Sequence, residues 1–310
     1  MNLLFNIAEG RKRYFLLSAI VIGLGIAAMI YSWVTTGAPF PLGVDFRSGT
    51  RFEVQFTEPV TESAIRDVFN EFDVNNPDVI ALRGDNLENA WQIRTEFVEN
   101  DRQGAIEAAL NDLAPLVPNT TETQSISPAI GQEVTRAAFI AILVATVIIL
   151  VYIMVVFRQV ANPFRYGVCA VTAMLHDLFV IFGFAAITGM FLGWEVDALF
   201  LTAVLTVAGF SLQDTIVVFD RIRENSQKRP TERYETVVNR SILETIHRSL
   251  ATQLNAMFVM VAILLFGGAS IKPFIAVLFV GLLSGTYSSI FTAVPMLVAW
   301  EKNEIPFLKA

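Results

Sequence analysis

The sequence predicts an integral membrane α-helical bundle of six transmembrane helices, with one water-exposed α+β domain between the first two. The first observation is composition: 54% of the 310 residues are hydrophobic and 16% are charged. A soluble domain carries about 25% charged residues. The second observation is that the apolar residues form long runs, and the third is that only residues 35–135 have the composition of a soluble domain.

Six apolar runs are long enough to cross a bilayer, because a transmembrane helix needs about 20 apolar residues. The runs are 14–34, 136–157, 166–188, 197–219, 250–269 and 273–299. The first run follows Arg11, Lys12 and Arg13, as the apolar part of a signal peptide would. No persuasive small-x-small cleavage site ends it, so we interpret it as a retained first helix.

Basic residues in the short connecting segments predict the orientation, since they gather on the cytoplasmic side. They lie in 1–13, between the second and third runs, in the amphipathic loop 220–249, and in the tail 300–310. The opposite short loops have Lys272 as their one basic residue. The pattern predicts cytoplasmic N- and C-termini and an extracytoplasmic 35–135 domain.

Within 35–135, the hydrophobic periodicity predicts the order β-α-β-β-α-β of a ferredoxin-like domain. Thr61 is placed to cap the first helix. The domain has no histidine, no cysteine and no nucleophile motif, so we expect a binding or mechanical domain and not an enzyme. The expected strands are 51–57, 79–83, 90–97 and 120–126, the expected helices are 61–73 and 101–116, and a polar turn is expected at 84–89.

Four ionisable residues lie within apolar runs or at their edges. His176 and Asp177 are near the middle of the third run, Asp214 is in the cytoplasmic third of the fourth, and Arg248 is where the fifth begins. An ionised side chain in mid-membrane costs roughly 2.5–3.5 kcal/mol on insertion scales, so such residues face a protein interior, a cavity or a partner.

Two interpretations of these residues stay open at this point. In the structural one, Asp177 pairs with His176 or another span, Asp214 is hydrated near the interface, and Arg248 extends to the headgroups. In the functional one, they form a proton relay, because movement of an arginine relative to a carboxylate switches the proton affinity of that carboxylate.

Other features point to packing. Gly281 and Gly285 form a GxxxG motif typical of close helix contact. Two uses are open for the polar run 284–289 beside them, the lining of a wet path or a bridge between helices, and packing between helices is the one we expect. Cys169, the single cysteine, is expected to be a buried inert thiol. No P-loop motif is present, and no cofactor is expected.

Short motifs in a fixed order run the length of the chain. They are GVDFRSGT at 43–50, SPAIGQEVTRAA at 127–138, LHD at 175–177, GFSLQDTIVVFDRIREN at 209–225, NRSILETIHRS at 239–249, LFGG at 265–268 and GTYSSIF at 285–291. Together they resemble the SecD/SecF family of bacterial protein-export membrane proteins, and within it the SecF members. This family is similar to one half of the resistance-nodulation-division transporters.

The resemblance implies a SecF-like subunit of the Sec translocase, in the bacterial plasma (inner) membrane. Such a subunit uses the proton-motive force with a SecD-like subunit to promote late stages of polypeptide export through SecYEG. The implied partners are the SecD-like subunit, SecYEG, the secreted unfolded polypeptide and protons, with no nucleic acid. Asp214 and Arg248 match the positions of the family's proton path, and Asp177 with His176 is a second candidate polar site.

The chain departs from the family pattern at three places. Arg47-Ser48 stands within the segment where the family has Asp-Phe-Thr-Gly-Gly, and Gln213 replaces an asparagine. The segment 251–257, which contains Gln253, lacks the usual Thr-Ser pair, and this leaves the polar lining of the fifth run open. Two rival functions also stay open: a scaffold that stabilises the translocon without transport, and one half of a small-molecule or lipid exporter.

Overall fold

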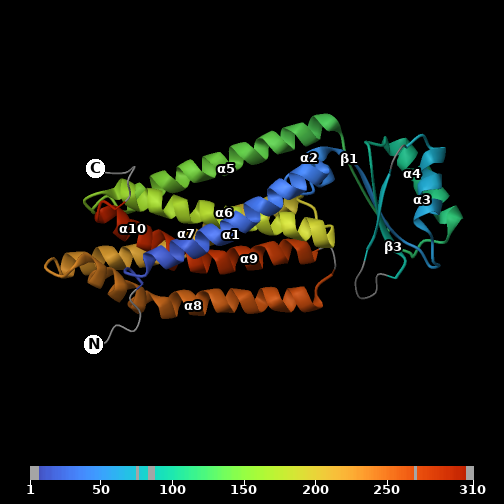
Figure 1. The fold of residues 1–310 in the computed structure, drawn as a ribbon. Coiled ribbons are helices and arrows are strands. Elements are labelled where there is room, and N and C mark those ends of the chain that lie inside the picture. The colour runs from blue at the N-terminus through green and yellow to red at the C-terminus, as the bar shows by residue number, and fades with distance from the viewer. Residues whose placement is uncertain (1–6, 75–76, 83–87, 269–270, 305–310) are drawn as a thin grey trace. The chain divides into compact units, whose positions relative to one another are not determined.

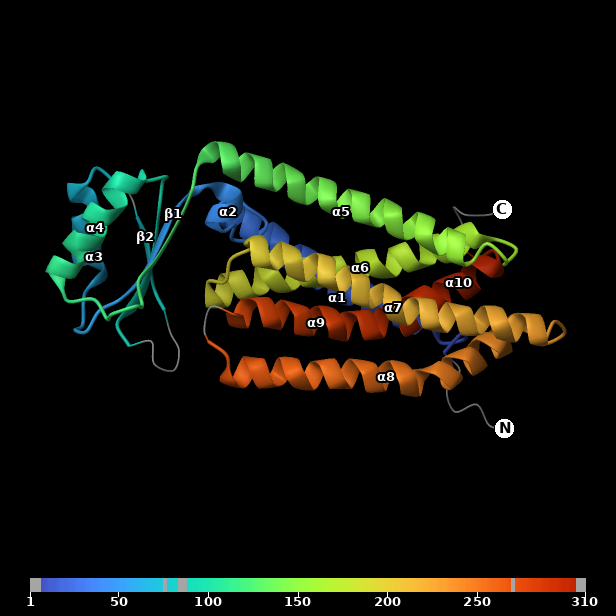
Figure 2. The ribbon, with the colours of Figure 1, turned by 180° about the vertical axis from the view of Figure 1, so that it is seen from behind.

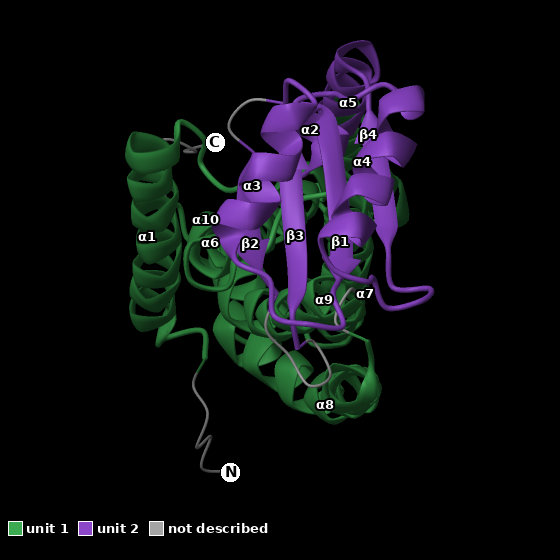
Figure 3. Cartoon of the chain, turned by 90° about the vertical axis from the view of Figure 1, so that its right-hand side faces the viewer, with its two compact units in different colours: residues 1–41, 140–310 green, residues 42–139 purple. Residues whose placement is uncertain are grey.

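The computed structural model describes residues 7–74, 77–82, 88–268 and 271–304. The chain divides into two compact units, which Figure 3 colours separately: residues 1–41 with 140–310, and residues 42–139. Most of the expected turn at 84–89, the last residue of the expected strand 79–83, and the outer ends of the N-terminal segment and the tail lie outside the described residues.

The larger unit is built from long helices (Figures 1 and 2). Six helical stretches of the described chain have the length and apolar composition to cross a membrane, as the sequence predicts. They are α1 (Arg11–Thr36), α5 (Pro128–Val156), α6 (Pro163–Leu192), α7 (Ala198–Lys228), α8 (Tyr234–Phe266), and α9 (Lys272–Ser288) continued by η2 (Ser289–Ala293) and α10 (Val294–Glu301).

Local chemistry explains where several of these helices begin and end. Gly37 ends α1 in the left-handed region, φ 79°, and its N–H donates to the Trp33 carbonyl at 2.9 Å. The Asp197 carboxylate caps α7 by accepting from the Phe200 N–H at 2.8 Å. The π-helical turn η2 comes just before Pro295, whose missing N–H interrupts the regular hydrogen-bond ladder.

The helices differ in how much of their apolar surface the protein itself covers. In α6, α7 and the α9–α10 stretch, 56%, 50% and 61% of the apolar window is buried, against 6% in α5 and 11% in α8. The first three therefore form the interior of the bundle, and most of α5 and α8 is left for lipid or a partner chain. A polar group placed among α6, α7 and α9 is consequently removed from both water and lipid.

Glycines let two pairs of helices approach closely. A Cβ on Gly183 of α6 would lie 2.6 Å from the Gly25 Cα of α1, and a Cβ on Gly281 of α9 would lie 2.4 Å from Val207 Cγ2 of α7. Real Cβ atoms do not come so near to another atom, so at both positions the neighbouring helix occupies the space that a side chain would need. The close packing predicted from Gly281 and Gly285 is confirmed for Gly281, and at Gly285 the contact is less close, with a Cβ 3.3 Å from the Ser211 Cα of α7.

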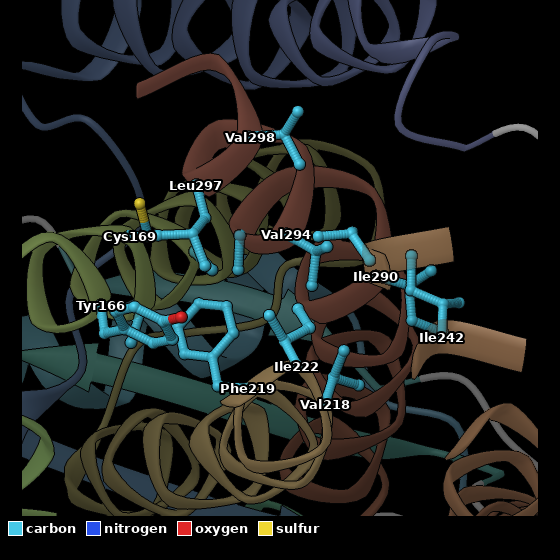
Figure 4. Close-up of a cluster of buried hydrophobic side chains, with 14 of the residues drawn as sticks. Tyr166, Cys169, Val218, Phe219, Ile222, Ile242, Ile290, Val294, Leu297 and Val298 are labelled. Atoms are coloured by element: carbon cyan, nitrogen blue, oxygen red, sulfur yellow. The ribbon is translucent and has the colours of Figure 1, made fainter. Parts of the chain in front are cut away.

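A cluster of buried apolar side chains joins α6, α7, α8 and the α9–α10 stretch (Figure 4). Its aromatic members interlock: the Tyr166 ring lies 5.2 Å from that of Phe157 and 5.1 Å from that of Phe219. Cys169 is fully buried in the same cluster, as predicted for an inert thiol. This packing fixes α6, α7 and α9 relative to one another beside the polar residues described below.

The helices α7 and α8 continue as a hairpin beyond their apolar runs. Arg221 on α7 donates to the Glu244 carboxylate on α8 at 2.5 Å, and Asn225 donates to the Ser241 hydroxyl at 3.0 Å. The segment 220–249 is therefore helical on both sides of a short turn. These contacts hold α8 against α7 at the same end from which Arg248 projects.

The smaller unit is a four-stranded antiparallel sheet with α3 and α4 over one face (Figure 1). The sheet order is β2-β3-β1-β4, and in the chain the order is β-α-β-β-α-β. The elements are α2 (Val44–Arg47), β1 (Gly49–Gln55), α3 (Glu62–Glu71), β2 (Asp78–Ala81), β3 (Ala90–Thr95), α4 (Asn100–Leu113) and β4 (Glu122–Ile126).

The sequence pattern of the first strand explains its burial. Phe52 and Val54 of β1, together with Phe56 beyond its end, alternate with polar residues and point into the core under α3 and α4. The Thr61 hydroxyl accepts from the Ala64 N–H and caps α3, which confirms the predicted cap. The short helix α2 was not predicted, because four residues are too few to show a periodicity.

Candidate functional site

Asp177 lies in α6 and is completely buried. Its Oδ2 accepts from the Ser211 hydroxyl of α7 at 2.5 Å and from the Ser288 hydroxyl of α9 at 2.7 Å. Its Oδ1 accepts from the Ser284 hydroxyl of α9 at 2.6 Å. One carboxylate thereby joins three helices of the bundle interior. These contacts agree with the structural interpretation, in which Asp177 bonds to other spans.

His176 completes this set of contacts. Its Nδ1 lies 3.0 Å from Asp177 Oδ1 and donates in the tautomer that carries the proton there. The ring stacks on Tyr287 of α9 at 5.9 Å, and the Tyr287 hydroxyl donates to the Tyr14 carbonyl of α1 at 3.0 Å. The other ring nitrogen, Nε2, is buried and has no hydrogen-bond partner within the described part of the chain.

Gly285 is the residue that lets the serines reach Asp177. A Cβ on Gly285 would lie 3.3 Å from Ser211 Cα and 3.6 Å from Asp177 Oδ2, so α9 packs against α7 and α6 at this level with its own backbone. Ser284 and Ser288 flank the glycine at helical spacing and point the same way. The prediction that the polar run 284–289 bridges helices is confirmed at these two serines.

Asp214 is the second buried carboxylate, in α7, with 4% of its surface exposed. Its Oδ2 accepts from the Gln253 side-chain amide of α8 at 2.6 Å, and Gln253 is itself 5% exposed. Ser249, one turn earlier on the same face of α8, is buried near Asp214 and its hydroxyl lacks a well-formed hydrogen bond. Asp214 is therefore enclosed by neutral polar groups.

Arg248 is not brought to Asp214. Its side chain is exposed on α8, and no ion pair joins it to Asp214 among the residues that the structure describes. Residues 248 and 253 lie about 140° apart around the helix, so they face different directions. Of the four residues singled out from the sequence, His176 and Asp177 are in contact, and Asp214 and Arg248 are apart.

Gln253 and Ser211 are the site residues that sequence reasoning did not assign. Gln253 was noted only as part of a departure from the family pattern. The spacing of Thr245, Ser249 and Gln253 at every fourth position within α8 is the signal that would have found it, because such residues share one face of a helix. Ser211 shows no comparable signal, since only the folded chain places it next to Asp177.

Nothing in the described chain suggests a metal centre, because no three of its His, Cys, Asp or Glu residues are grouped to hold an ion. One small pocket, of about 20 Å³, is lined by Thr188 of α6, by Trp194 in the segment between α6 and α7, and by Phe274 of α9. A cavity of that size holds about one water molecule.

Comparison with known proteins gives this geometry a family. The model of "Protein export membrane protein SecD/SecF, C-terminal" matches residues 105–303, and that of the "SecD/SecF GG Motif" matches residues 33–60. The chain belongs to the SecD/SecF family. The first of these matches covers Asp177, Asp214 and Arg248, and the second covers the 43–50 segment from which part of the resemblance was drawn.

The most similar relatives include two proteins named protein translocase subunit SecF. The one from Anaerolinea thermophila is 38% identical over 97% of this chain and 96% of its own length. The one from Thermobaculum terrenum is 39% identical over 97% of this chain and 95% of its own length. This chain is thus a SecF-like translocase subunit, a multi-pass membrane protein of protein transport.

Some relatives are much longer than this chain and are named SecDF. Protein translocase subunit SecDF of Bacillus subtilis is 32% identical over 97% of this chain, which covers 39% of that protein. A crystal structure of SecDF, a translocon-associated membrane protein from Thermus, superposes with a TM-score of 0.79 at 27% identity. It covers 96% of this chain, and the chain spans 39% of it.

Proposed function

We propose that this SecF-like subunit couples proton movement to protein export through Asp214. The observation that carries the proposal is a carboxylate buried in a transmembrane helix, with a neutral amide as its hydrogen-bond donor at 2.6 Å. Burial favours the neutral acid and hydrogen bonding favours the anion. Small helix movements therefore alter the balance between the two, and no cation among the residues that the structure describes is paired with the carboxylate.

Energetics make such a group useful for work. The membrane potential supplies about 2.3 kcal/mol per elementary charge per 100 mV. An arginine brought beside the carboxylate would expel its proton, and an arginine withdrawn would let the proton bind. Arg248 lies on the neighbouring helix α8, and its side chain is exposed and not beside Asp214 in this structure. We assign its approach to Asp214 to the step of the cycle in which the proton is released.

Asp177 and His176 form a second polar site in the same proposal. The three serines that bond to Asp177 come from α7 and α9. This site joins the interior helices and transmits movement between them. Proton binding there is not required by the proposal.

The partner follows from the share of the longer relatives that the chain covers. The chain corresponds to 39% of SecDF from Bacillus subtilis, and the rest of that length is what a SecD-like subunit would supply. The largely uncovered helices α5 and α8 are suited to meet such a subunit. The further partners are SecYEG, the unfolded secreted polypeptide, and protons.

Orientation and location follow the positive-inside pattern of the sequence. Both termini and the segment 220–249 are cytoplasmic, the spans follow the apolar runs, and the domain 35–135 is extracytoplasmic, on a bacterial inner membrane. The order β2-β3-β1-β4 supports a ferredoxin-like arrangement of that domain between the first two spans. Helix movements swing this domain, which holds and releases the emerging polypeptide.

Gradient-dependent export from inverted membrane vesicles tests the proposal. Vesicles carrying the whole translocase with Asp214→Asn are expected to lose the gradient-dependent part of export while the complex still assembles. Asp220→Asn, the matched control on the exposed cytoplasmic part of α7, should export like the wild type. A scaffold would keep gradient-dependent export in both variants, and that result would refute the proton role.

The exporter interpretation has its own test. A small-molecule or lipid exporter would show gradient-dependent efflux of a hydrophobic dye from vesicles that lack SecYEG. We expect no such efflux, because an exporter would need a large extracytoplasmic domain to form a substrate pocket and the unit 42–139 is small.

A further inference from the structure

The hydrogen bond between Gln253 and Asp214 joins two helices inside the membrane. Both side chains are at least 95% buried, and the distance from Nε2 to Oδ2 is 2.6 Å. Gln253 stands in the segment where the chain departs from its family pattern. An amide in such a place costs free energy unless it is hydrogen-bonded, so its presence calls for a specific reason.

The chemistry of an amide differs from that of an arginine at this position. The amide carries two N–H donors at one end and a carbonyl acceptor at the other, whereas a guanidinium only donates. An ionised Asp214 can accept from the amide nitrogen, the contact that Gln253 makes with Asp214 Oδ2 in this structure. A protonated Asp214 can donate its own O–H to the amide oxygen once the amide has turned by 180° about its last bond. Gln253 is therefore able to bond to either form of the acid.

The groups around Asp214 leave this role to Gln253. In this stretch, the ionisable residues on the helices packed against α7 are His176 and Asp177 on α6, His247 and Arg248 on α8, and Tyr287 on α9. His176 and Asp177 are bonded to each other and to serines. His247 and Arg248 are exposed. Ser249 lies beside Asp214 with a hydroxyl that is free to join the bond.

We propose that Gln253 is a positioning residue of the proton site: it holds the Asp214 side chain against α8 in both protonation states. The inference rests on the proposed proton role of Asp214. It goes beyond that role because it assigns the arrangement seen here, with Gln253 bonded and Arg248 withdrawn, to one stage of the cycle.

Two variants of Gln253 in the full translocase test this inference, with pH profiles of gradient-dependent export as the measurement. Gln253→Met keeps the volume and removes donor and acceptor. Its profile should move by about one pH unit toward higher pH, because the hydrogen bond lost from the ionised form involves a charged acceptor and is stronger than the one lost from the neutral acid. Asn255→Met removes an amide from the exposed face of α8 and should leave the profile unchanged.

Gln253→Glu provides the rescue. A protonated glutamic acid donates and accepts as the amide does, so this variant should approach wild-type export on the acid side and lose it where both carboxyls ionise. A purely structural role would not produce that dependence. An independent readout is pH-difference infrared spectroscopy, in which the carboxyl band that Asp214→Asn abolishes should move in Gln253→Met.

The outcomes separate the two proposals. If Asp214→Asn keeps gradient-dependent export, the proposed function fails. If Asp214→Asn is inactive while Gln253→Met keeps the wild-type profile and infrared band, only the positioning role fails. If Gln253→Met does not assemble, a wild-type profile for Gln253→Glu over the whole pH range would overturn the inference, and acid-side recovery would support it.

Discussion

Ser211 and Asp214 lie one helical turn apart on α7, yet they bond to different helices. Ser211 donates to Asp177 of α6, and Asp214 accepts from Gln253 of α8. Three residues correspond to about 4.5 Å along the helix axis. Within α7, the hydroxyl of Thr215, the residue after Asp214, donates to the Ser211 carbonyl at 3.1 Å. A shift of α7 therefore acts on both buried carboxylates at once.

The two carboxylates differ in how firmly they are held. Asp177 accepts three serine hydroxyls and faces His176, and all of these lie on interior helices. Asp214 is bonded to α8, which is mostly uncovered by the rest of the chain. We therefore expect α8 to move against the interior helices more readily than α6, α7 and α9 move against one another.

Removal of the serine donors should destabilise the bundle. The double variant Ser284→Ala and Ser288→Ala leaves Asp177 buried with two bonds fewer, each worth about 1–2 kcal/mol between helices in a membrane. We expect a clearly lower thermal unfolding temperature in detergent. Ser289→Ala, whose hydroxyl donates only to its own helix at 3.2 Å, should change that temperature little. Equal effects of the two changes would contradict the bridging role of the serines.

Contact between α1 and α6 depends on two glycines. Gly183→Ala puts a methyl group 2.6 Å from the Gly25 Cα, so the helices must separate at a cost of about 1–3 kcal/mol. Gly23→Ala on α1 meets no atom within 4 Å and should be neutral. The measurement is the thermal unfolding temperature of each variant in detergent, and a neutral Gly183→Ala would show that α1 does not pack as described.

The fold was largely predictable because hydrophobic pattern determines it. Long apolar runs specify spanning helices, and the alternation in 51–57 specifies a half-buried strand, which β1 occupies from Gly49 to Gln55. Helix ends were less predictable. The structure starts α5 at Pro128, whereas the apolar run begins at 136, because a helix continues through polar residues that an apolar count excludes.

The site was predictable only in part, for geometric reasons. A charged residue in an apolar run marks Asp177 and Asp214, since burial of a charge is costly. Partners such as Ser211 and Gln253 come from distant parts of the chain, and an ordinary serine or glutamine carries no such mark. The family resemblance predicted a role for Arg248. Whether Arg248 faces Asp214 depends on how α8 is rotated about its axis, and a sequence motif does not specify that rotation.

An ion pair outside the membrane should give a pH dependence of known sign. Arg11 donates to the Glu304 carboxylate from Nε at 2.9 Å, and this contact lowers the pKa of Glu304 below its ordinary value. Because the pKa of Glu304 is lower in the folded chain than in the unfolded chain, the ion pair stabilises the folded form at pH values above the unfolded pKa of about 4.3. This stabilisation is lost as the pH falls through the folded-state pKa.

Glu304→Gln should accordingly weaken the attachment of the segment after α10 to the start of α1 at pH 7 and have no effect near pH 3. Glu304 is 41% exposed, so the effect stays below about 1 kcal/mol. Hydrogen exchange of the amides at 8–13 measures it. Glu9→Gln, the same charge change at an exposed position, is the control, and equal exchange in both variants would contradict the ion pair.

Cysteine labelling can establish which face of α8 meets Asp214. Cys169 is fully buried, so the wild type should resist N-ethylmaleimide and serve as the background. Arg248→Cys should react about tenfold faster than Gln253→Cys in the isolated chain, because thiol reactivity needs access to water. The comparison uses initial labelling rates in detergent, and equal rates would mean that α8 is rotated relative to this structure.

The same pair of variants reports on the partner. If a SecD-like subunit covers the exposed face of α8, its presence should protect Arg248→Cys from labelling and leave the slow rate of Gln253→Cys unchanged. Both the isolated chain and the complex are labelled in detergent, which covers the same apolar surface in each. Protection of Arg248→Cys in the complex alone would therefore come from the partner and not from lipid or detergent. Continued fast labelling of Arg248→Cys in the assembled complex would place the partner on another face, with α5 and α1 as the other largely uncovered helices of the described chain.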